Sequence, residues 1–191
     1  LLGLLALTPL VTGAATADTA ADRATTPTPA ASEMSLEIDI SERTLYVRHG
    51  DDVETYPVAV GMPEYPTPTG DFSITQVTWN PDWRPPPDSE WSEDEEYMEP
   101  DHPDNPMGKV KIMWKAPDYT IHGTDDHDSL GTNQSHGSVR LANESAVALA
   151  KRVMAHGRSS RSQEWYEMAV RDDGDQHVVE LSNPISISVH E

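Results

Sequence analysis

From residue 35 onward the chain carries short hydrophobic runs that alternate with polar residues. Three of them, SLEIDI (35–40), TLYVRH (44–49) and VETYPVAV (53–60), are rich in β-branched residues, and turn-forming residues separate them. Alternation with a period of two is typical of strands with one buried face. Short polar links between such runs are typical of hairpins. The pattern therefore predicts an antiparallel meander.

More strands are predicted after PTPTG (66–70), whose prolines and glycine make a rigid turn. Strand-like segments follow at DFSITQVT (71–78), VKIMWK (110–115), DYTIHG (118–123), HVVELS (177–182) and ISISV (185–189). Most of the chain beyond residue 34 therefore has strand character.

One segment has a helical period. Asn143 suits an N-cap, and Gly157 suits the helix end. Between them the apolar positions form one helical face: Ala146, Val147, Leu149, Ala150, Val153 and Met154. The segment WYEMAV (165–170) suits either a strand or a short helix. The elements together predict a mainly β fold, mixed β with one or two helices.

The first residues predict export. LLGLLALTPLV (1–11) has the length of a signal-peptide core, and Ala15-Thr16-Ala17 has the small-x-small pattern of a cleavage site. We therefore interpret residues 1–17 as the remnant of a secretory signal peptide and expect no stable membrane span. Residues 18–33, rich in Ala, Thr and Pro, predict a flexible linker. Residues 34–191 are the predicted folded domain.

The net charge of the chain excludes some classes of function. With 13 basic and 33 acidic residues the formal net charge is −20, so binding to nucleic acid is not expected. Ten of these acidic residues fall between Asp82 and Asp104, together with five prolines and two tryptophans. This segment, the acidic loop (82–104), is either a solvated surface loop or a lid over an active site.

Candidate chemistry is concentrated between Ile121 and Leu141. Acyl transfer requires a nucleophile, a base within hydrogen-bond reach and donors for the developing oxyanion. His122 follows a predicted strand, and the turn 135–138 offers main-chain N–H groups around a glycine. Ser138 lies at the end of this turn, and the guanidinium of Arg140 suits a substrate carboxylate.

These residues, in this order, resemble the L,D-transpeptidase family with its YkuD-type catalytic domain. The signature pieces are His122-Gly123-Thr124, Gly131 and Ser135-His136-Gly137-Ser138-Val139-Arg140, where the family has cysteine at the fourth position of the last piece. Supporting pieces are Thr67-Pro68-Thr69-Gly70-Asp71-Phe72, Asn80-Pro81-Asp82-Trp83 and Asn105-Pro106-Met107-Gly108. The resemblance covers roughly residues 35–155 and implies an L,D-transpeptidase-like β-sandwich catalytic domain.

The resemblance also implies a function. Members are exported cell-wall enzymes that cleave the bond between a diamino acid and the terminal D-alanine of a peptidoglycan stem tetrapeptide. They pass the acyl group to an amine on a second stem, making a 3→3 cross-link, or on an envelope protein. By this resemblance the chain is extracytoplasmic, in the periplasm or cell wall, and uses no metal or organic cofactor.

Site roles follow residue by residue from the same resemblance. Ser138 occupies the nucleophile position, His122 that of the base, and the Gly123 carbonyl that of the group that orients the base. Ser135, His136 and Gly137, with residue 138, form the oxyanion turn, and Arg140 lies near the substrate.

The serine is a departure, because a hydroxyl cannot be held ionised beside histidine as a thiol can. Three explanations stay open: an engineered replacement of cysteine, a natural serine enzyme of weak or altered activity, and a noncatalytic module that binds stem peptides. A different interpretation is a metal-dependent hydrolase. Its metal ligands would be His122, His127 and either Asp128 or His136. Those histidines lack the helical i, i+4 spacing of known zinc signatures.

Overall fold

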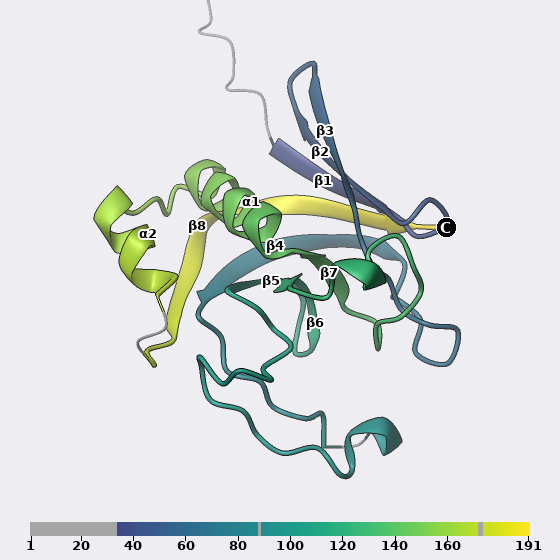
Figure 1. Ribbon diagram of the computed structural model, residues 1–191. Coiled ribbons are helices and arrows are strands. Elements are labelled where there is room, and N and C mark those ends of the chain that lie inside the picture. Colours follow the sequence, from purple (N-terminus) through teal and green to yellow (C-terminus); the bar gives the residue numbers. More distant parts are fainter. Residues whose placement is uncertain (1–33, 88, 172–173) are drawn as a thin grey trace, which may run out of the picture. The chain divides into compact units, whose positions relative to one another are not determined.

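A computed structural model describes residues 34–87, 89–171 and 174–191 (Figure 1). The predicted signal peptide and linker, residues 1–33, lie outside the described residues. Of the helices that the structure describes, none has the length and apolar character needed to span a bilayer.

The described part of the chain is mainly β, as predicted. One eight-stranded mixed sheet has the order β3-β2-β1-β8-β4-β5-β6-β7. Its strands are β1 (Met34–Asp39), β2 (Thr44–His49), β3 (Asp52–Pro57), β4 (Gly70–Trp79), β5 (Val110–Lys115), β6 (Tyr119–Thr124), β7 (Val139–Ala142) and β8 (His177–His190). The expected antiparallel meander is confirmed in β1, β2 and β3.

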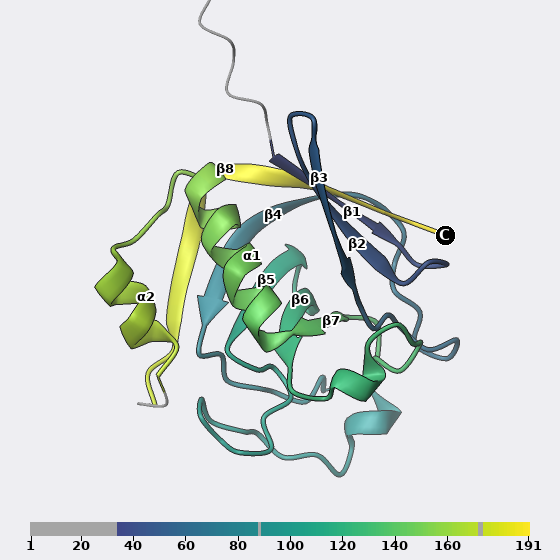
Figure 2. The same ribbon diagram turned by 45° about the horizontal axis from the view of Figure 1, so that its top comes forward.

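The last strand differs from the prediction, because the two expected segments form one long strand. β8 pairs parallel with β1 and antiparallel with β4, and it bends sharply between the two ends (Figure 2). The register of the β4 pairing shifts between Ile74 and Gln76. Pro184 lies at this irregularity, where the missing N–H costs no ladder bond. The Asn-Pro dipeptide therefore marks a bend inside a strand instead of a turn.

The sheet nearly closes on itself. Beyond β3 the chain continues to Ala59, which pairs antiparallel with Arg140 of β7 through two main-chain hydrogen bonds of 3.1 and 2.9 Å. A second bridge joins Gly61 to Ser135. The two ends of the sheet order are thus connected, and the result is barrel-like. This closure fixes the segment that carries Ser138 from both sides.

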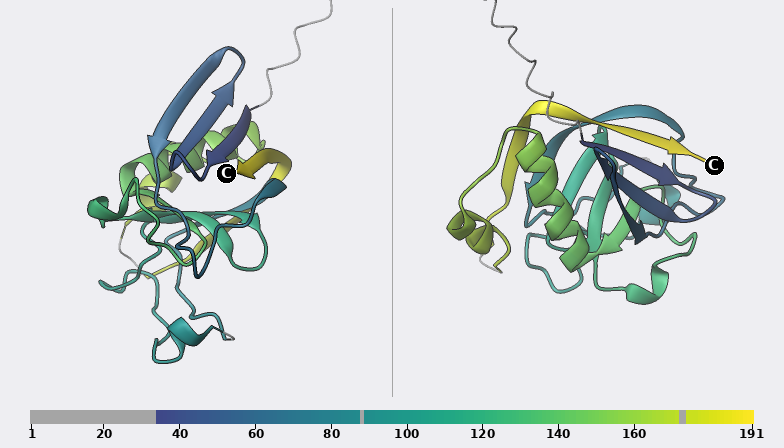
Figure 3. Two further views of the ribbon diagram at one scale, coloured as in Figure 1. Left: turned by 90° about the vertical axis from the view of Figure 1, so that its right-hand side faces the viewer. Right: turned by 90° about the horizontal axis from the view of Figure 1, so that it is seen from above.

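Two helices complete the domain. α1 (Asn143–His156) lies against the sheet (Figure 3), where it contacts β5, β6, β7 and β8. Its apolar face is buried there, through Ala146, Leu149, Ala150, Val153 and Met154. It ends at Gly157, as predicted. α2 (Gln163–Ala169) resolves the ambiguous segment as a helix, and the Ser162 side chain caps it by accepting from the Trp165 N–H. Buried Trp79 packs against Met154 and Tyr166 in the core below.

The prediction that Asn143 caps α1 is wrong. Ala142 is the cap, and the Asn143 side chain has tertiary partners instead. Its Oδ1 accepts from Lys109 N–H at 3.0 Å, and its Nδ2 donates to Asp125 Oδ1 at 2.8 Å. A Cβ atom on Gly108 or Gly123 would lie 2.2 or 2.0 Å from Oδ1. The amide is thus packed directly against two glycine backbones.

Replacing Asn143 by alanine should therefore destabilise the fold. The change leaves the Lys109 N–H without this partner and opens a small void, so we expect a loss of about 1–3 kcal/mol in the free energy of unfolding, measured by urea denaturation. Asn133 is the control, because it is exposed and the hydrogen bonds of its amide are long: Oδ1 accepts from Arg43 Nη1 at 3.3 Å, and Nδ2 donates to Gly61 O at 3.5 Å. Equal effects of Asn143→Ala and Asn133→Ala would contradict this role.

Candidate active site

The motif residues converge where β6 and β7 run parallel at one end of the sheet order. Between these strands the chain passes through the short 3-10 helix η2 (His127–Ser129) and the turn 135–138. The segment 58–62 holds this turn: Ser135 N–H donates to Val60 O at 3.0 Å, and Met62 N–H donates to Ser135 O at 2.9 Å. His122 and Ser138 both line one cavity of about 910 Å³.

His122 is almost completely buried, with 3% of its surface exposed. Its Nδ1 lies 2.9 Å from the Gly123 carbonyl. Because a nitrogen facing a carbonyl oxygen must carry the hydrogen, Nδ1–H donates and Nε2 is the free base. Burial lowers the pKa of His122 to about 4, and the positive charges of Arg140 and Lys111 act in the same direction. The imidazole is therefore neutral at physiological pH.

Ser138 is partly exposed, and its hydroxyl is held by the main chain. Oγ donates to Asp118 O at 3.2 Å and accepts from Thr120 N–H at 3.2 Å. Within the described residues, Ser138 Oγ makes no hydrogen bond to His122. The hydroxyl must therefore turn away from Asp118 before His122 can accept its proton.

The turn before Ser138 requires a glycine. Gly137 has φ +105°, and a Cβ there would lie 2.9 Å from a ring carbon of Tyr119. Its carbonyl accepts from the Thr67 hydroxyl at 2.9 Å, and that hydroxyl accepts from Gly61 N–H at 2.8 Å. Gly137 N–H itself donates to Ser135 Oγ at 3.1 Å. The conformation of the turn is thus set by hydrogen bonds on both of its sides.

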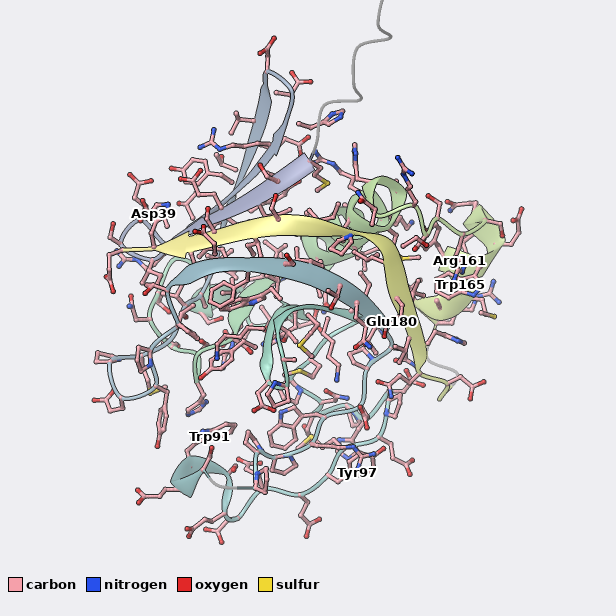
Figure 4. The ribbon with its side chains drawn as sticks, turned by 180° about the vertical axis from the view of Figure 1, so that it is seen from behind. Asp39, Trp91, Tyr97, Arg161, Trp165 and Glu180 are labelled. Atoms are coloured by element: carbon pink, nitrogen blue, oxygen red, sulfur yellow. The ribbon has the colours of Figure 1, made fainter. Side chains whose placement is uncertain are left out.

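The acidic loop lies across the cavity from the sheet. Trp83 and Met98 exchange main-chain hydrogen bonds of 2.9 and 3.0 Å, which close the loop on itself. A short 3-10 helix, η1 (Glu90–Ser92), carries Trp91, whose ring stacks on His136 with centroids 3.9 Å apart and an angle of 9°. Figure 4 labels Trp91 and Tyr97 in this loop. The residues Glu93, Asp94, Glu95 and Glu96 are exposed.

His136 and Arg140 differ in how far they are exposed. His136 is exposed on one side, and partial burial against the loop lowers its pKa. Arg140 is partly buried and lies 3.7 Å from Asp126 Oδ2, which makes an ion pair with a half-exposed carboxylate. Both side chains line the cavity.

Sequence reasoning missed two charged residues in the cavity. Lys111 and Asp82 form an ion pair of 3.8 Å, with side chains 22% and 10% exposed. Burial lowers the pKa of Lys111, while Asp82 opposes this shift. The alternation in VKIMWK places Lys111, Met113 and Lys115 on one face of β5. It does not reveal that this face lines a cavity.

The metal-hydrolase reading is not supported by the geometry. Among the residues with described positions, no group of three or more His, Asp or Glu side chains is arranged to hold an ion. His127 and Asp128 are exposed in η2, whereas His122 is buried on β6.

Comparison with known proteins agrees with the predicted family and fold. The family model of the L,D-transpeptidase catalytic domain (YkuD) matches residues 33–179. The putative L,D-transpeptidase YqjB of Bacillus subtilis is 33% identical over 103 residues, covering 51% of this chain and 53% of that protein. The putative L,D-transpeptidase YkuD of the same organism is 28% identical over 128 residues, covering 66% of this chain and 65% of that protein.

Solved structures show the same fold. L,D-transpeptidase 3 from Mycobacterium tuberculosis superposes with a TM-score of 0.54 at 18% identity, covering 84% of this chain and 62% of that one. The chain thus spans only part of the length of the proteins that it matches. It belongs to the L,D-transpeptidase (YkuD) family, as a member with no cysteine anywhere in its 191 residues.

Proposed function

We propose that this chain carries out L,D-transpeptidase-type acyl transfer on peptidoglycan stem tetrapeptides, with Ser138 as a slow nucleophile. The observation that carries the proposal is that Ser138 and the buried, neutral His122 line the same cavity. Its size lies within the range of small-ligand sites. The cavity also exposes Arg140, which suits a substrate carboxylate.

The proposed reaction begins with rotation of the Ser138 hydroxyl toward His122. Oγ attacks the carbonyl carbon between the diamino acid and the terminal D-alanine, and its proton passes to His122 Nε2. The Gly123 carbonyl holds the imidazolium that forms. His122 then gives the proton to the leaving amine, D-alanine departs, and the stem remains as an ester on Ser138.

The oxyanion formed in this step needs donors at the turn. Gly137 N–H already donates to Ser135 Oγ, so we assign the oxyanion to the main-chain N–H groups of His136 and Ser138. In the second half of the reaction an amine attacks the ester and His122 takes the amine proton. His122 then returns this proton to Ser138 Oγ as the C–O bond of the ester breaks, so both residues regain their starting states. An amine on a second stem gives a 3→3 cross-link. An amine on an envelope protein gives an amide bond that anchors this protein to the stem.

Peptidoglycan as the substrate implies a location outside the cytoplasmic membrane, in the periplasm or cell wall. The signal-peptide pattern in residues 1–17 supports the same location. The partners of this reaction are stem peptides and an amine acceptor, without nucleic acid and without a cofactor.

The acidic loop is proposed as a lid. Trp91 covers one face of His136 in the turn, while the acidic run beyond it is exposed. A cover of this kind excludes water from the ester on Ser138 and so favours transfer to an amine over hydrolysis.

A noncatalytic stem-binding module is the second candidate. The hydrogen bond from Ser138 Oγ to Asp118 O favours it, because the hydroxyl at rest points away from the base. The two functions share the cavity and differ in whether Ser138 becomes acylated.

Ser138→Cys should raise the rate of acylation by about 100-fold or more, because a thiol ionises far more readily than a hydroxyl. Intact-protein mass spectrometry with a carbapenem as the acylating probe measures the rate. Adding His122→Ala to the cysteine form should slow labelling by about 100-fold. A labelling rate that Ser138→Cys leaves unchanged would show that serine is already competent, and labelling of neither form would favour the binding module.

The acylation rate of the unchanged chain should vary little between pH 5.5 and 8. Burial holds the pKa of His122 at about 4, so the neutral base is fully present across this range and is lost only as the pH falls toward 4. D-alanine release from a stem tetrapeptide, followed over this range, provides the measurement. A tenfold decline below an inflection near pH 6.5 would mean that the base is a solvated histidine instead.

Trp91→Ala in the Ser138→Cys form should increase hydrolysis relative to transfer. Removing the ring uncovers His136 and admits water to the acyl-enzyme. Tyr97→Ala is the matched control, because Tyr97 lies in the same loop, is 45% exposed and stacks on Arg84 instead. The measurement is the ratio of cross-linked to hydrolysed stems, determined by chromatography. An equal ratio in the two variants would contradict a lid.

A further inference from the structure

A row of three side chains crosses neighbouring strands at the floor of the cavity. Lys111 on β5 pairs in register with His122 on β6, and His122 pairs in register with Arg140 on β7. Paired positions in a sheet point to the same face, and all three side chains line the cavity. A cation therefore stands on each side of the proposed base.

The geometry of the sheet sets the spacing of these cations. Neighbouring strands lie about 4.8 Å apart, so the main chains of Lys111 and Arg140 are roughly 10 Å apart. Because both side chains are long, their charged groups can lie several ångströms closer together or farther apart than the two main chains. The row can therefore hold two carboxylates that lie on either side of one reacting carbonyl group.

Lys111 has hydrogen-bonding capacity to spare. Within the described residues its ammonium contacts Asp82 alone, with Oδ1 at 3.8 Å and the main-chain oxygen at 3.5 Å. Both distances exceed those of ordinary N–H···O hydrogen bonds, which lie between about 2.7 and 3.2 Å. A largely buried ammonium with three donors is costly unless a ligand completes its bonding.

The local charge also favours an anion at Lys111. Asp82 lies 3.0 Å from Arg84 Nε as well, so one carboxylate serves two cations and a positive charge remains. The other acidic residues that line the cavity are all exposed: Glu64, Glu95, Asp104 and Asp118. In a chain of net charge −20, the cavity thus has a basic floor beneath an acidic rim.

We propose that Lys111 and Arg140 together select a donor stem with two carboxylates around the scissile bond. Lys111 binds the side-chain carboxylate of a diaminodicarboxylic acid, and Arg140 binds the terminal carboxylate of the leaving residue. This inference rests on the proposed function and specifies its substrate class. Stems whose diamino acid is amidated, or carries no side-chain carboxylate, lack the group that Lys111 binds.

The distance of each cation from Ser138 decides which of the two carboxylates it binds. The terminal carboxylate is one residue from the scissile carbonyl, so it must stay near Ser138. Arg140 lies two positions after Ser138, on the same side of the chain. Lys111 is two strands away from β7, within reach only of a group carried on a long side chain.

The test uses two synthetic stem tetrapeptides that differ only in whether the side-chain carboxylate of the diamino acid is free or amidated. Isothermal titration calorimetry with the unchanged chain should give a Kd about tenfold or more lower for the free form, since each factor of ten is 1.4 kcal/mol. Lys111→Met should remove this preference, and Lys111→Arg should retain it.

Lys115→Met is the matched control, because Lys115 lines the same cavity from the same face of β5 but lies over the Tyr119 ring. It should leave the preference unchanged. Equal affinities for the two stems, or a preference that survives Lys111→Met, would overturn the role of Lys111 while the proposed function stands. Failure of both stems to bind would overturn the proposed function along with it.

Discussion

The buried amide of Asn143 joins three segments on which the site depends. It receives a hydrogen bond from Lys109 N–H just before β5 and donates one to Asp125 just after β6. It also packs against the backbones of Gly108 and Gly123. The Gly123 carbonyl in turn orients His122. A side chain on either glycine would collide with this amide. The base is therefore positioned from the protein interior, and the side that faces substrate remains free for binding.

Because the base lies in the protein interior, a charged imidazole is unfavourable there before the reaction begins. His122 is neutral because burial outweighs the two carbonyl oxygens, of Gly123 and Pro106, that favour its protonation. A thiolate–imidazolium pair would place two opposite charges here, and each would need the other as compensation. A serine hydroxyl leaves both groups neutral and well bonded in the ground state. The cost of separating charge then falls in the transition state, where the proton must move, and this makes the proposed acyl transfer by Ser138 slow.

The sequence predicts the strands better than the connections between them. Alternation identifies β1, β2 and β5, because each has one buried face and one more exposed face. It is less informative at β3, which is almost wholly exposed, and at β6, which is almost wholly buried. It fails at β8, because Asn183-Pro184 has turn chemistry and only the pairing with β4 shows a bulge within a strand. Asn143 has the preferences of an N-cap, but its tertiary partners decide its role. From the sequence Lys111 looks like an ordinary solvent-facing residue of a strand. A two-residue period cannot distinguish a face open to solvent from a face that lines a cavity under the preceding acidic loop (82–104).

The placement of the acidic loop reconciles a strongly negative chain with the proposed anionic substrate. Its carboxylates at the rim are exposed, so salt at about 0.1 M screens them beyond roughly 10 Å. Lys111 and Arg140 lie deeper, where water is scarcer and each interaction is screened less. A stem that approaches the proposed site is therefore repelled at the rim by charges that salt screens strongly, and is attracted farther in by charges that salt screens less. The tryptophan side of the loop adds exclusion of water without adding charge. Charge is thus segregated by depth: the carboxylates of the loop lie in solvent, and the two cations of the sheet lie at the proposed substrate site.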